Sequence, residues 1–412
     1  MLSKLNSNIR PAAILLAILG GGTAHATLSH TGSVSTISPS DYLAIGSSGN
    51  GQVLINGHTH IQTQGASIGQ ASGRTGVLTV QGPDAKYRAV YYNSGDIRVG
   101  DYGNGHLNVT NGGFVSTDDD LYIATRTGST GIVQAHGAGT QIKVRDTIKV
   151  GYAGNGQLRI SQGAQVETRN ATYVGYRSGA TGYVNVGGAG SLLDIHCGVR
   201  IGYYGNGRMD IQDGGRVQNH GTAVVGYKHN SQGILNVADR GSVFTTYSSR
   251  LVNGYCGTGR IDISNGGQVF NTRGDYRNNA ISTLAFGLSA DYLADDFWAM
   301  NTAGDILSLG LLDVYLSSGY ELGANQTYNM FNVAGTTSSM FTGYGQDSSL
   351  GVFGDHELYI SYTGGNGNDI VFYTLDDPTH GGEPSAVPEP VSIALGSMGL
   401  LALARRTSRR SK

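Results

Sequence analysis

The chain has 412 residues, 66 of them glycine, and a formal net charge of −2 from 27 basic and 29 acidic residues. Seven of the basic residues lie in the two terminal segments, which leaves 20 basic against 29 acidic residues and a net charge near −9 for the body of the chain. This balance gives no basic patch for nucleic acid, so we expect no nucleic-acid partner, and the absence of Gly-X-Y triplets excludes collagen.

The start of the chain has the pattern of a secretory signal peptide over residues 1–26. Basic residues lead into the apolar run PAAILLAILGGG, and Ala24-His25-Ala26 fits the small-x-small rule for cleavage. We therefore expect export through the inner membrane and a mature chain that begins at Thr27.

A fifteen-residue phrase then recurs at a spacing of 51 to 54 residues. Its clear copies are VGDYGNGHLNVTNGG from Val99, VGYAGNGQLRISQGA from Val150 and IGYYGNGRMDIQDGG from Ile201, with worn copies from Ile45 and Val252. A weaker phrase lies between these copies, as in VGYRSGATGYVNVGGAGS from Val174. The opening glycines are then separated by about 24 or about 27 to 31 residues, which suits one solenoid coil each.

Each coil contains a short strand with one buried and one exposed face. In the second clear copy, Leu158 and Ile160 share one face and Arg159 lies on the other, which is the period of a half-buried strand. The Gly-Asn-Gly before it suits a tight corner, and a second short strand follows at 165–167. Strands this short must pair with those of the coils above and below. We therefore predict an all-β fold, a parallel β-helix (β-solenoid) of about nine to twelve coils over residues 27–279.

The end of the repeat region should be closed by a different unit, because a β-helix end exposes unpaired strand edges. We assign residues 280–375 to a C-terminal β capping segment. Within this segment we expect a short helix at 291–300, alternating strands at 306–316 and 328–333, and a hairpin of 357–362 against 369–374.

The C-terminal end carries three elements in order after a linker at 376–386. The motif Val387-Pro388-Glu389-Pro390 precedes fourteen mostly apolar residues, and an arginine-rich end then begins with Arg405 and Arg406. A helix of that length spans about 21 Å, which is short of a hydrocarbon core of about 30 Å. We therefore expect transient membrane insertion followed by processing, with an ordinary single-pass anchor as the alternative.

This ending resembles the PEP-CTERM sorting tail, which is also catalogued as an ice-binding protein C-terminal domain. The resemblance covers residues 387–412 and implies an exosortase as the processing partner. It also implies delivery to the cell surface or the extracellular polysaccharide matrix of a Gram-negative-type bacterium. The coils at 45–269 resemble the repeat shared by autotransporter passengers and PEP-CTERM proteins, and residues 280–375 resemble the segment that closes such proteins.

Tyrosine is unusually common, with 24 copies against nine phenylalanines and one tryptophan. Five tyrosines follow the glycine that opens a coil: Tyr152, Tyr176, Tyr203, Tyr227 and Tyr255. Stacked coils would align them in a ladder, with each aromatic pair worth about 0.5–1.5 kcal/mol. The ladder has two interpretations, structural stacking along the solenoid or a ligand-binding platform for sugar rings.

Three patterns could bind metal ions, but each has a simpler interpretation. Residues 364–372 fit one copy of a calcium-binding nonapeptide, but a single copy lacks half of the ligands and also suits a hairpin turn. His58 and His60 supply only two imidazoles, and residues 118–120 form an acidic run typical of a solvated turn. We therefore expect neither a metal site nor a cofactor.

Arg208 and Asp210 recur as Arg260 and Asp262, which looks like a site on the outer face of the solenoid. Other copies have different residues there, so charge pairing on a solvated strand explains them. The sequence contains no nucleophile elbow, P-loop or metalloprotease motif, and we expect no catalytic residues and no enzyme activity.

The two cysteines, Cys197 and Cys256, differ by seven residues in their place relative to the nearest corner glycine. That offset corresponds to as much as about 23 Å of extended chain, against a Cα limit near 7 Å for a disulfide. We therefore predict two free thiols.

These features favour an exported structural or interaction protein that presents a rigid β-solenoid at the cell surface or in the extracellular polysaccharide matrix. The alternative is a carbohydrate-binding adhesin that uses the tyrosine ladder, with extracellular polysaccharide as the partner. A polysaccharide lyase or hydrolase is less favoured. Ice binding is less favoured again, because the threonines do not recur in coil register.

Overall fold

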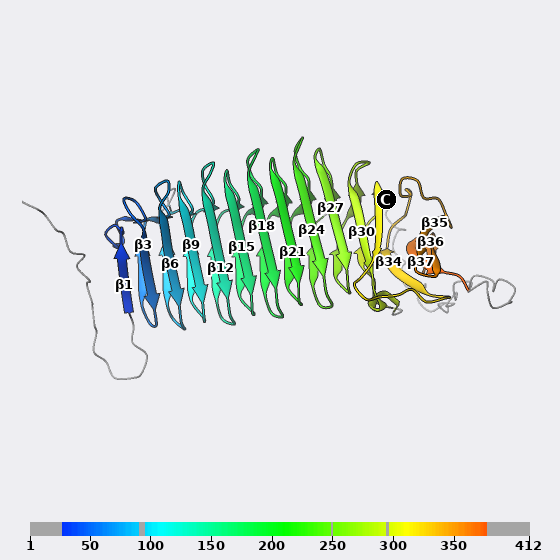
Figure 1. The fold of residues 1–412 in the computed structure, drawn as a ribbon, viewed down its shortest axis with the longest axis horizontal. Helices are drawn as coiled ribbons and strands as arrows, with labels where there is room; N and C mark the ends of the chain where they lie inside the picture. Colours follow the sequence, from blue (N-terminus) through cyan, green and yellow to red (C-terminus); the bar gives the residue numbers. More distant parts are fainter. Residues whose placement is uncertain (1–26, 90–94, 249, 294–295, 377–412) are drawn as a thin grey trace, which may run out of the picture.

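The computed structural model describes residues 27–89, 95–248, 250–293 and 296–376. The predicted signal peptide with Ala24 and Ala26, nearly all of the predicted linker, and the predicted sorting tail with its Val-Pro-Glu-Pro motif lie outside the described residues. The chain winds through three sheets of twelve, eleven and fourteen strands, and each coil contributes one strand to each sheet. Figure 1 shows the result, a rod of stacked coils that runs in chain order from β1 to the C-terminal strands. The predicted all-β solenoid is therefore confirmed.

The first sheet is parallel throughout except for its first strand, which pairs antiparallel with the second. Its strands in spatial order are β1 (Thr27–Gly32), β3 (Gly51–Asn56), β6 (Thr75–Gln81), β9 (Asn104–Thr110), β12 (Thr130–His136), β15 (Asn155–Ser161), β18 (Thr181–Gly187), β21 (Asn206–Gln212), β24 (Gln232–Ala238), β27 (Thr258–Ser264), β30 (Thr283–Leu288) and β33 (Leu311–Leu316). These strands contain the predicted Leu-x-Ile pattern.

The second sheet has the shortest strands and lies just before the glycine corners. Its strands in spatial order are β2 (Tyr42–Ile45), β5 (Gly65–Ile68), β8 (Ile97–Val99), β11 (Leu121–Ile123), β14 (Ile148–Val150), β17 (Ala171–Val174), β20 (Gly198–Ile201), β23 (Thr222–Val225), β26 (Arg250–Asn253), β29 (Asp275–Asn278) and β32 (Ile306–Ser308). Two strands per coil were predicted from the sequence, and this third strand was missed because it is only three or four residues long and ends directly before the residue, usually glycine, that opens the coil.

The third sheet follows the second corner of each coil and holds the predicted second strand. Its strands in spatial order are β4 (His60–Thr63), β7 (Lys86–Ala89), β10 (Phe114–Thr117), β13 (Gln141–Val144), β16 (Gln165–Thr168), β19 (Leu192–Ile195), β22 (Arg216–Asn219), β25 (Val243–Thr246), β28 (Gln268–Asn271), β31 (Met300–Thr302), β34 (Thr327–Val333), β37 (Asp369–Thr374), β36 (His356–Gly364) and β35 (Ser349–Phe353).

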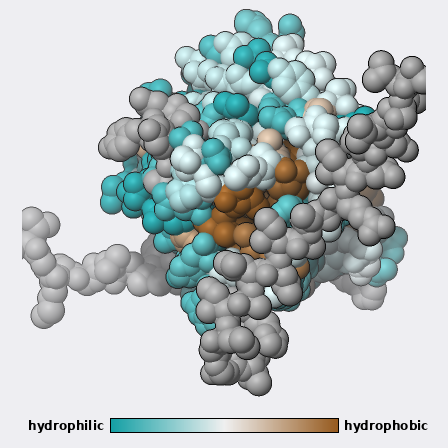
Figure 2. Space-filling model, turned by 90° about the vertical axis from the view of Figure 1, so that its left-hand side faces the viewer, coloured by the Kyte–Doolittle hydropathy of each residue, from teal (hydrophilic) through white to brown (hydrophobic). Residues whose placement is uncertain are grey.

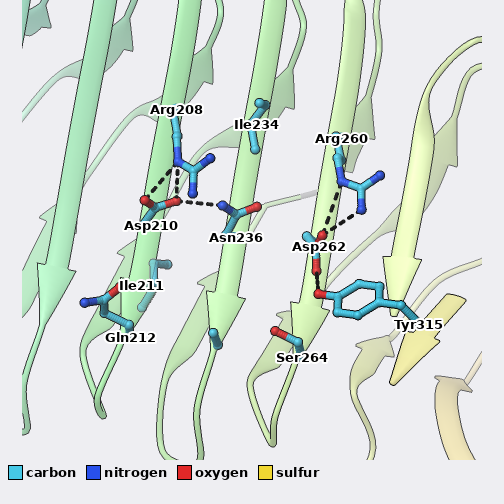
Figure 3. Close-up of a pocket in the computed structure, with 11 residues that line it drawn as sticks. Arg208, Asp210, Ile211, Gln212, Ile234, Asn236, Arg260, Asp262, Ser264 and Tyr315 are labelled. Atoms are coloured by element: carbon cyan, nitrogen blue, oxygen red, sulfur yellow. Dashed lines mark hydrogen bonds and ion pairs between the residues drawn. The ribbon is translucent and has the colours of Figure 1, made fainter. Parts of the chain in front are cut away.

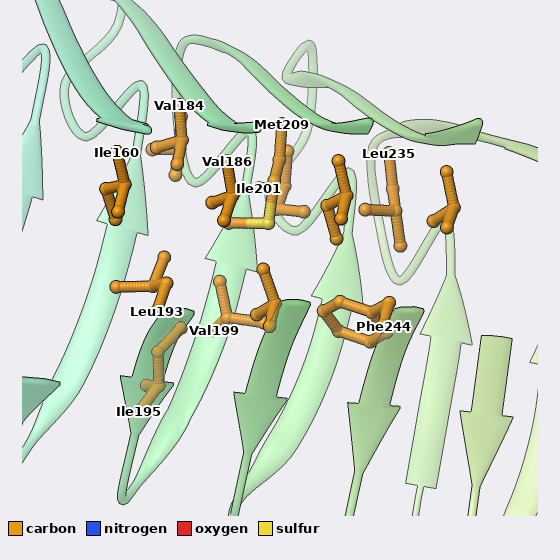
Figure 4. Packing of buried hydrophobic residues seen from close by; sticks show 14 of the residues in the cluster. Ile160, Val184, Val186, Leu193, Ile195, Val199, Ile201, Met209, Leu235 and Phe244 are labelled. Atoms are coloured by element: carbon orange, nitrogen blue, oxygen red, sulfur yellow. The ribbon is translucent and has the colours of Figure 1, made fainter. Parts of the chain in front are cut away.

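The core is a continuous apolar column inside the three sheets. Met209 of the first sheet, Val199 of the second sheet and Phe244 of the third point toward one another, and none is more than 1% exposed (Figure 4). Burial of one such side chain contributes about 1.5–3 kcal/mol, and every coil repeats it. Because each strand alternates buried and exposed residues, the same register also fixes which residues reach the outer surface.

Parallel stacking continues beyond residue 279, the predicted end of the repeat region. β30 pairs parallel with β27 and with β33, and β34 pairs parallel with β31. The change comes after β34, where β37, β36 and β35 add to the third sheet in antiparallel order. The later coils have lost the Gly-Asn-Gly phrase but keep the apolar alternation, and that alternation is what the stacking requires.

Two predictions for the C-terminal segment were wrong. The expected helix at 291–300 is a single 3-10 turn, η1 (Ala290–Leu293), and Met300 already lies in a strand. The expected strand at 306–316 is divided between two sheets as β32 and β33, because Gly310 has a φ of +60° and turns the chain between them. The predicted strand at 328–333 and the hairpin of β36 with β37 are confirmed.

The N-terminal end of the rod exposes hydrophobic side chains at its centre. Figure 2 views this end and shows hydrophobic side chains gathered at its centre within a hydrophilic surround. Leu28, Val34, Ile37 and Ile61 of the first coil are partly buried against the core. Within the part of the chain that the structure describes, no helix has both the length and the apolar character needed to cross a membrane.

Candidate functional site: the tyrosine edge

Five tyrosines stack along the corner between the second and first sheets. They occupy one corner position in consecutive coils: Tyr152, Tyr176, Tyr203, Tyr227 and Tyr255. Neighbouring ring centroids are 5.0, 5.1, 5.1 and 5.3 Å apart, and neighbouring ring planes are inclined by 17°, 27°, 20° and 13°. The ladder predicted from the sequence is therefore a continuous stack.

The glycine before each tyrosine sets this alignment. Gly151 and Gly202 have φ values of +66° and +72°, and a Cβ on Gly151 would lie 2.1 Å from the carbonyl oxygen of Thr181 in the next coil. The amide of Tyr176 donates to the Gly151 carbonyl oxygen at 2.9 Å, and the amide of Tyr227 donates to that of Gly202 at 2.8 Å. Because each tyrosine is bonded to the corner of the preceding coil, successive rings lie one above another.

Stacking covers the faces of the inner rings and leaves their edges and hydroxyl groups accessible. Tyr176 and Tyr203 are half-buried, whereas Tyr255 at the end of the stack is 56% exposed. Burial, with a smaller contribution from neighbouring tyrosines, raises the pKa of the Tyr176 and Tyr203 hydroxyls, so both stay protonated and able to donate hydrogen bonds. The inner rings therefore offer hydroxyl groups to a ligand, and flat ring faces are not available on them.

A second row runs beside the stack on the outer face of the second sheet. Pairing register places five residues at equivalent positions of successive strands: Arg98, Tyr122, Lys149, Tyr173 and Arg200. Tyr122 meets Tyr152 edge-on at 5.1 Å, and Tyr173 meets Tyr176 and Tyr203 edge-on at 5.2 and 4.9 Å. The row therefore braces the stack from one side.

Three cations lie over these rings, and Arg126 lies over the neighbouring exposed ring of Tyr102. Among the described residues, these four cations form no ion pair with a carboxylate: Arg126, Arg177, Arg200 and Lys228. The Arg177 guanidinium lies 4.8 Å from the Tyr152 ring centroid and donates to its hydroxyl at 2.8 Å. The Lys228 ammonium lies 5.1 Å from the Tyr227 ring centroid. The five stacked tyrosines, Tyr122, Tyr173 and these four cations are called the tyrosine edge below.

The net charge of the chain concealed this local group of cations. At this corner, register gathers cations that are distant in sequence; the prediction that the chain has no nucleic-acid partner stays a prediction. Two other cations nearby are already paired, Arg98 with Asp96 at 2.7 Å and Lys149 with Asp120. The sequence signal that would have identified the unpaired group is the Tyr-Arg of VGYRSG and the Tyr-Lys of VGYKHN, which occupy one position of the weaker phrase.

A shallow pocket on the outer face of the first sheet contains the recurring Arg–Asp pairs (Figure 3). Asp210 is 8% exposed and accepts hydrogen bonds from Arg208 at 2.9 Å, Tyr183 at 2.9 Å and Asn236 at 2.8 Å. Asn236 lies in the coil between the two Arg–Asp pairs, next to Asp210 on one side and to Asp262 on the other.

The second pair has the same self-contained arrangement. Arg260 donates to Asp262 at 2.8 Å and also pairs with Asp313 at 2.8 Å, and the Tyr315 hydroxyl donates to Asp262 at 2.6 Å. Tyr315 crosses β30 over Gly287, where a Cβ would lie 2.7 Å from its ring. Burial, followed by the hydrogen bond to Asp262, raises the pKa of Tyr315 to about 12. Both aspartates are therefore engaged in bonds within the protein, as the charge-pairing interpretation predicted.

The acidic run at 118–120 divides among different contacts. Asp118 pairs with Arg145 at 3.2 Å, and Asp119 and Asp120 lie with Asp96 in a group whose carboxylate oxygens are within 4.8 Å of one another. Burial raises the pKa of Asp96 and of Asp119, and neighbouring carboxylates raise them further. Asp120 accepts from the Thr147 amide at 2.9 Å in addition to its ion pair. The run is thus tied into the second sheet as well as solvated.

The remaining metal-ligand candidates lie at separate positions of the fold. His58 is exposed and lies 3.3 Å from Asp84, and His60 is exposed at the start of β4. Asp369 in the nonapeptide-like segment is 3% exposed and accepts hydrogen bonds from the Val333 amide at 2.7 Å and the Asn366 amide at 3.3 Å. The segment forms the turn between β36 and β37, as its simpler interpretation predicted.

The two cysteines lie on different corners of the solenoid. Cys197 precedes β20, whereas Cys256 follows Tyr255 at the end of the tyrosine edge, and both are exposed and outside any disulfide. This agrees with the prediction of two free thiols.

The geometry is that of a β-solenoid that presents long, repetitive outer surfaces. No family model matches the chain, and no solved structure matches it. The chain is similar to YdeK, an uncharacterized lipoprotein of Escherichia coli strain K12, with 28% identity over 224 residues. The similarity covers 53% of this chain but only 16% of the length of that relative.

Proposed function

We propose that this protein is an exported structural or interaction protein that displays a rigid β-solenoid at the cell surface or in the extracellular polysaccharide matrix. The observation that carries the proposal is the continuous strand-to-strand stacking of the coils from β2 through β34, in which the described strands keep register except for a shift between β29 and β32. Such a rod holds the outer residues of its stacked strands at fixed spacing from coil to coil.

The cellular location of the protein is inferred from two independent features. The predicted signal peptide and sorting tail, by their resemblance to PEP-CTERM proteins, direct the chain outward and make an exosortase the processing partner. The similarity to a protein named as a lipoprotein favours a cell-envelope location as well. Transient insertion of the tail in the membrane, followed by release or surface delivery, is part of this proposal.

A non-enzymatic role is favoured by the pocket on the first sheet. Its two aspartates accept hydrogen bonds from arginine, tyrosine and asparagine side chains of the protein itself. General acid–base catalysis needs a carboxyl or imidazole group that can exchange a proton with substrate, and these carboxylates are held as acceptors in ion pairs. We therefore propose that the pocket stabilises the stacking of β21, β24, β27 and β33.

The test is fractionation of the native host with mass spectrometry of the mature chain. We expect a chain that begins at Thr27, ends near Pro388 or Pro390, and is degraded when intact cells are treated with an external protease. An intact tail in the inner-membrane fraction would replace sorting by permanent anchoring. Recovery in the cytoplasm with residues 1–26 retained would refute the proposal.

A further inference from the structure

We propose that the tyrosine edge binds an acidic polysaccharide, a linear polymer of uronic-acid type whose carboxylates contact Arg126, Arg177, Arg200 and Lys228. This inference deepens the proposed function, on which it depends for where the polymer is encountered. Binding itself is a property of the purified chain and can be measured separately from location.

The cations repeat along the rod with the period of the double coil. Arg126, Arg177 and Lys228 are each 51 residues apart and occupy the same corner position, two residues after the residue that opens the coil. Coils are about 4.8 Å apart, so the three cations recur about every 10 Å along the axis. Arg200 lies on the neighbouring row between the last two. A regular line of charges is complementary to a polymer that repeats its own charges, and less so to a single small anion.

The hydroxyl groups of the stack add hydrogen-bond donors at every coil. Tyr176 and Tyr203 keep their protons at neutral pH, and their rings follow one another at 5.1 Å. A carboxylate accepts hydrogen bonds from guanidinium, ammonium and hydroxyl groups alike, and charge-assisted bonds are the stronger ones. The cations therefore supply most of the expected affinity for the polysaccharide, and the hydroxyl groups align its carboxylates along the stack.

The geometry disfavours the two nearest alternative ligands. Single-stranded nucleic acid binds to open aromatic faces, and the inner rings of this stack cover one another at centroid distances of 5.0 to 5.3 Å. A neutral polysaccharide would need the same open faces and would leave the four cations without a partner. The exposed rings near this corner are Tyr255 at the end of the stack, 56% exposed, and Tyr102 and Tyr204, 51% and 45% exposed, which lie outside the stack with Arg126 and Lys228 over them.

At this corner, unpaired cations recur in coil register over aromatic rings, whereas several cations on the first sheet and near the third are paired. Arg208 and Arg260 on the first sheet, and Arg145 and Lys143 near the third, each have a carboxylate within 3.5 Å. An anionic polymer would have to displace those carboxylates, whereas at the tyrosine edge it replaces only water and the weak attraction of the rings.

The test measures binding of the purified full-length chain to sodium polygalacturonate by biolayer interferometry, with EDTA present and with salt varied. Dextran and a thymidine oligonucleotide serve as competing probes. We expect binding to polygalacturonate that weakens as salt rises, since exposed ion pairs are screened. The triple variant Arg177→Gln/Arg200→Gln/Lys228→Gln should bind about tenfold more weakly or worse.

The matched control removes three positive charges from another surface. Arg88→Gln/Arg169→Gln/Arg216→Gln changes exposed residues beside the third sheet, so it lowers the net charge equally without touching the tyrosine edge. A third variant, Tyr176→Phe/Tyr203→Phe/Tyr227→Phe, keeps the stack and removes its hydroxyls, and we expect binding about threefold weaker. Circular dichroism and thermal midpoints establish that each variant is folded.

Specific loss of polygalacturonate binding in the edge variant, with the control unchanged, supports the proposal. Equal losses in the edge variant and the control would mean non-specific charge attraction and would overturn it. Stronger binding of dextran or of the oligonucleotide than of polygalacturonate would also overturn it and would assign the edge to that ligand instead. Failure of export in the host would leave the binding result standing, so the two proposals fail separately.

Discussion

The tyrosine edge and the pocket on the first sheet are both formed by the register of the coils. They differ in charge pairing, because the arginines of the pocket have carboxylate partners and the cations of the edge do not. In the pocket each arginine has an aspartate two residues later on its own strand, as in Arg208 with Asp210. At the tyrosine edge the residues that neighbour Arg177 and Lys228 are tyrosines, and the cations lie over rings. The charges of the pocket are paired within the protein, whereas the cations of the tyrosine edge have no carboxylate partner among the described residues.

This difference follows from the alternation of a strand. Residues two apart on one strand share a face, so an Arg-x-Asp sequence pairs its own charges wherever it is placed. A corner has no such alternation, and its residues meet the equivalent corners of the coils above and below and the outer row of the second sheet. A repeat that places tyrosine at one corner position and a cation at the next therefore generates an aromatic and cationic row without internal carboxylates.

We expect the largest effect on both surfaces from a substitution that disturbs the coil register on which both depend. Gly202→Ala places a Cβ 2.2 Å from the Gln232 carbonyl oxygen at a φ of +72°. We expect it to lower the free energy of unfolding by about 3 kcal/mol, from steric overlap added to the left-handed backbone. Urea unfolding followed by circular dichroism measures the loss, and near-ultraviolet spectra report the tyrosine stack.

Gly179→Ala is the matched control for that substitution. Its φ of +77° is nearly the same, but no atom lies within 4 Å of the added Cβ. The expected cost is about 1–2 kcal/mol, from the backbone alone. Equal losses for the two substitutions would show that close contact between coils does not set the register.

The charge pairing in the pocket is tested next by Asp210→Ala. This substitution removes the acceptor of Arg208, Tyr183 and Asn236 together, and we expect a loss of about 2 kcal/mol in the free energy of unfolding. Arg177→Ala at the tyrosine edge is the comparison, and it should change stability by less than about 1 kcal/mol because its partners are rings and solvent. A larger effect at Arg177 would make the edge a structural element and weaken its assignment as a binding surface.

Chemical modification of the two thiols can locate the polymer site more closely. Cys256 lies beside Tyr255, whereas Cys197 lies on another corner. In Cys197→Ser, modification of Cys256 with a bulky maleimide should weaken polygalacturonate binding about fivefold, by obstruction at the end of the stack. In Cys256→Ser, the same reagent on Cys197 should leave binding unchanged, and a loss there would place the polymer elsewhere.

The smallest expected effect concerns pH. Burial, with neighbouring carboxylates, raises the pKa of Asp119 above its usual value of 3.8, so the folded chain holds this proton more tightly than the unfolded chain does. The contribution of Asp119 is therefore most favourable at low pH and is lost as pH rises from about 3.8 through the raised pKa. Asp119→Asn should stabilise the protein by about 0.5 kcal/mol at neutral pH, with a smaller gain at low pH. If Asp119→Asn stabilised the protein equally at all pH values, the raised pKa of Asp119 would not be the cause of the stabilisation.

The repeat allowed much of this structure to be predicted. Leu158 and Ile160 are fully buried, and the tyrosines after the corner glycines are stacked, because a fixed period places equivalent residues at equivalent positions. The segment after residue 280 was predicted less well. There Gly310 divides an apparently single strand, and Met300 is buried in a strand where a helix was expected, since no repeat constrains those residues.

The sequence by itself determined the solenoid, its apolar interior and the tyrosine stack, because all three follow from a local pattern repeated at a constant spacing. Only the tertiary structure decided which charges are paired. Tyr315 reaches Asp262 across a glycine, Lys149 reaches Asp120 in the preceding coil, and Arg200 has rings but no carboxylate. Pairing depends on distances of a few ångströms between residues of different coils, and these distances arise only when the coils are stacked.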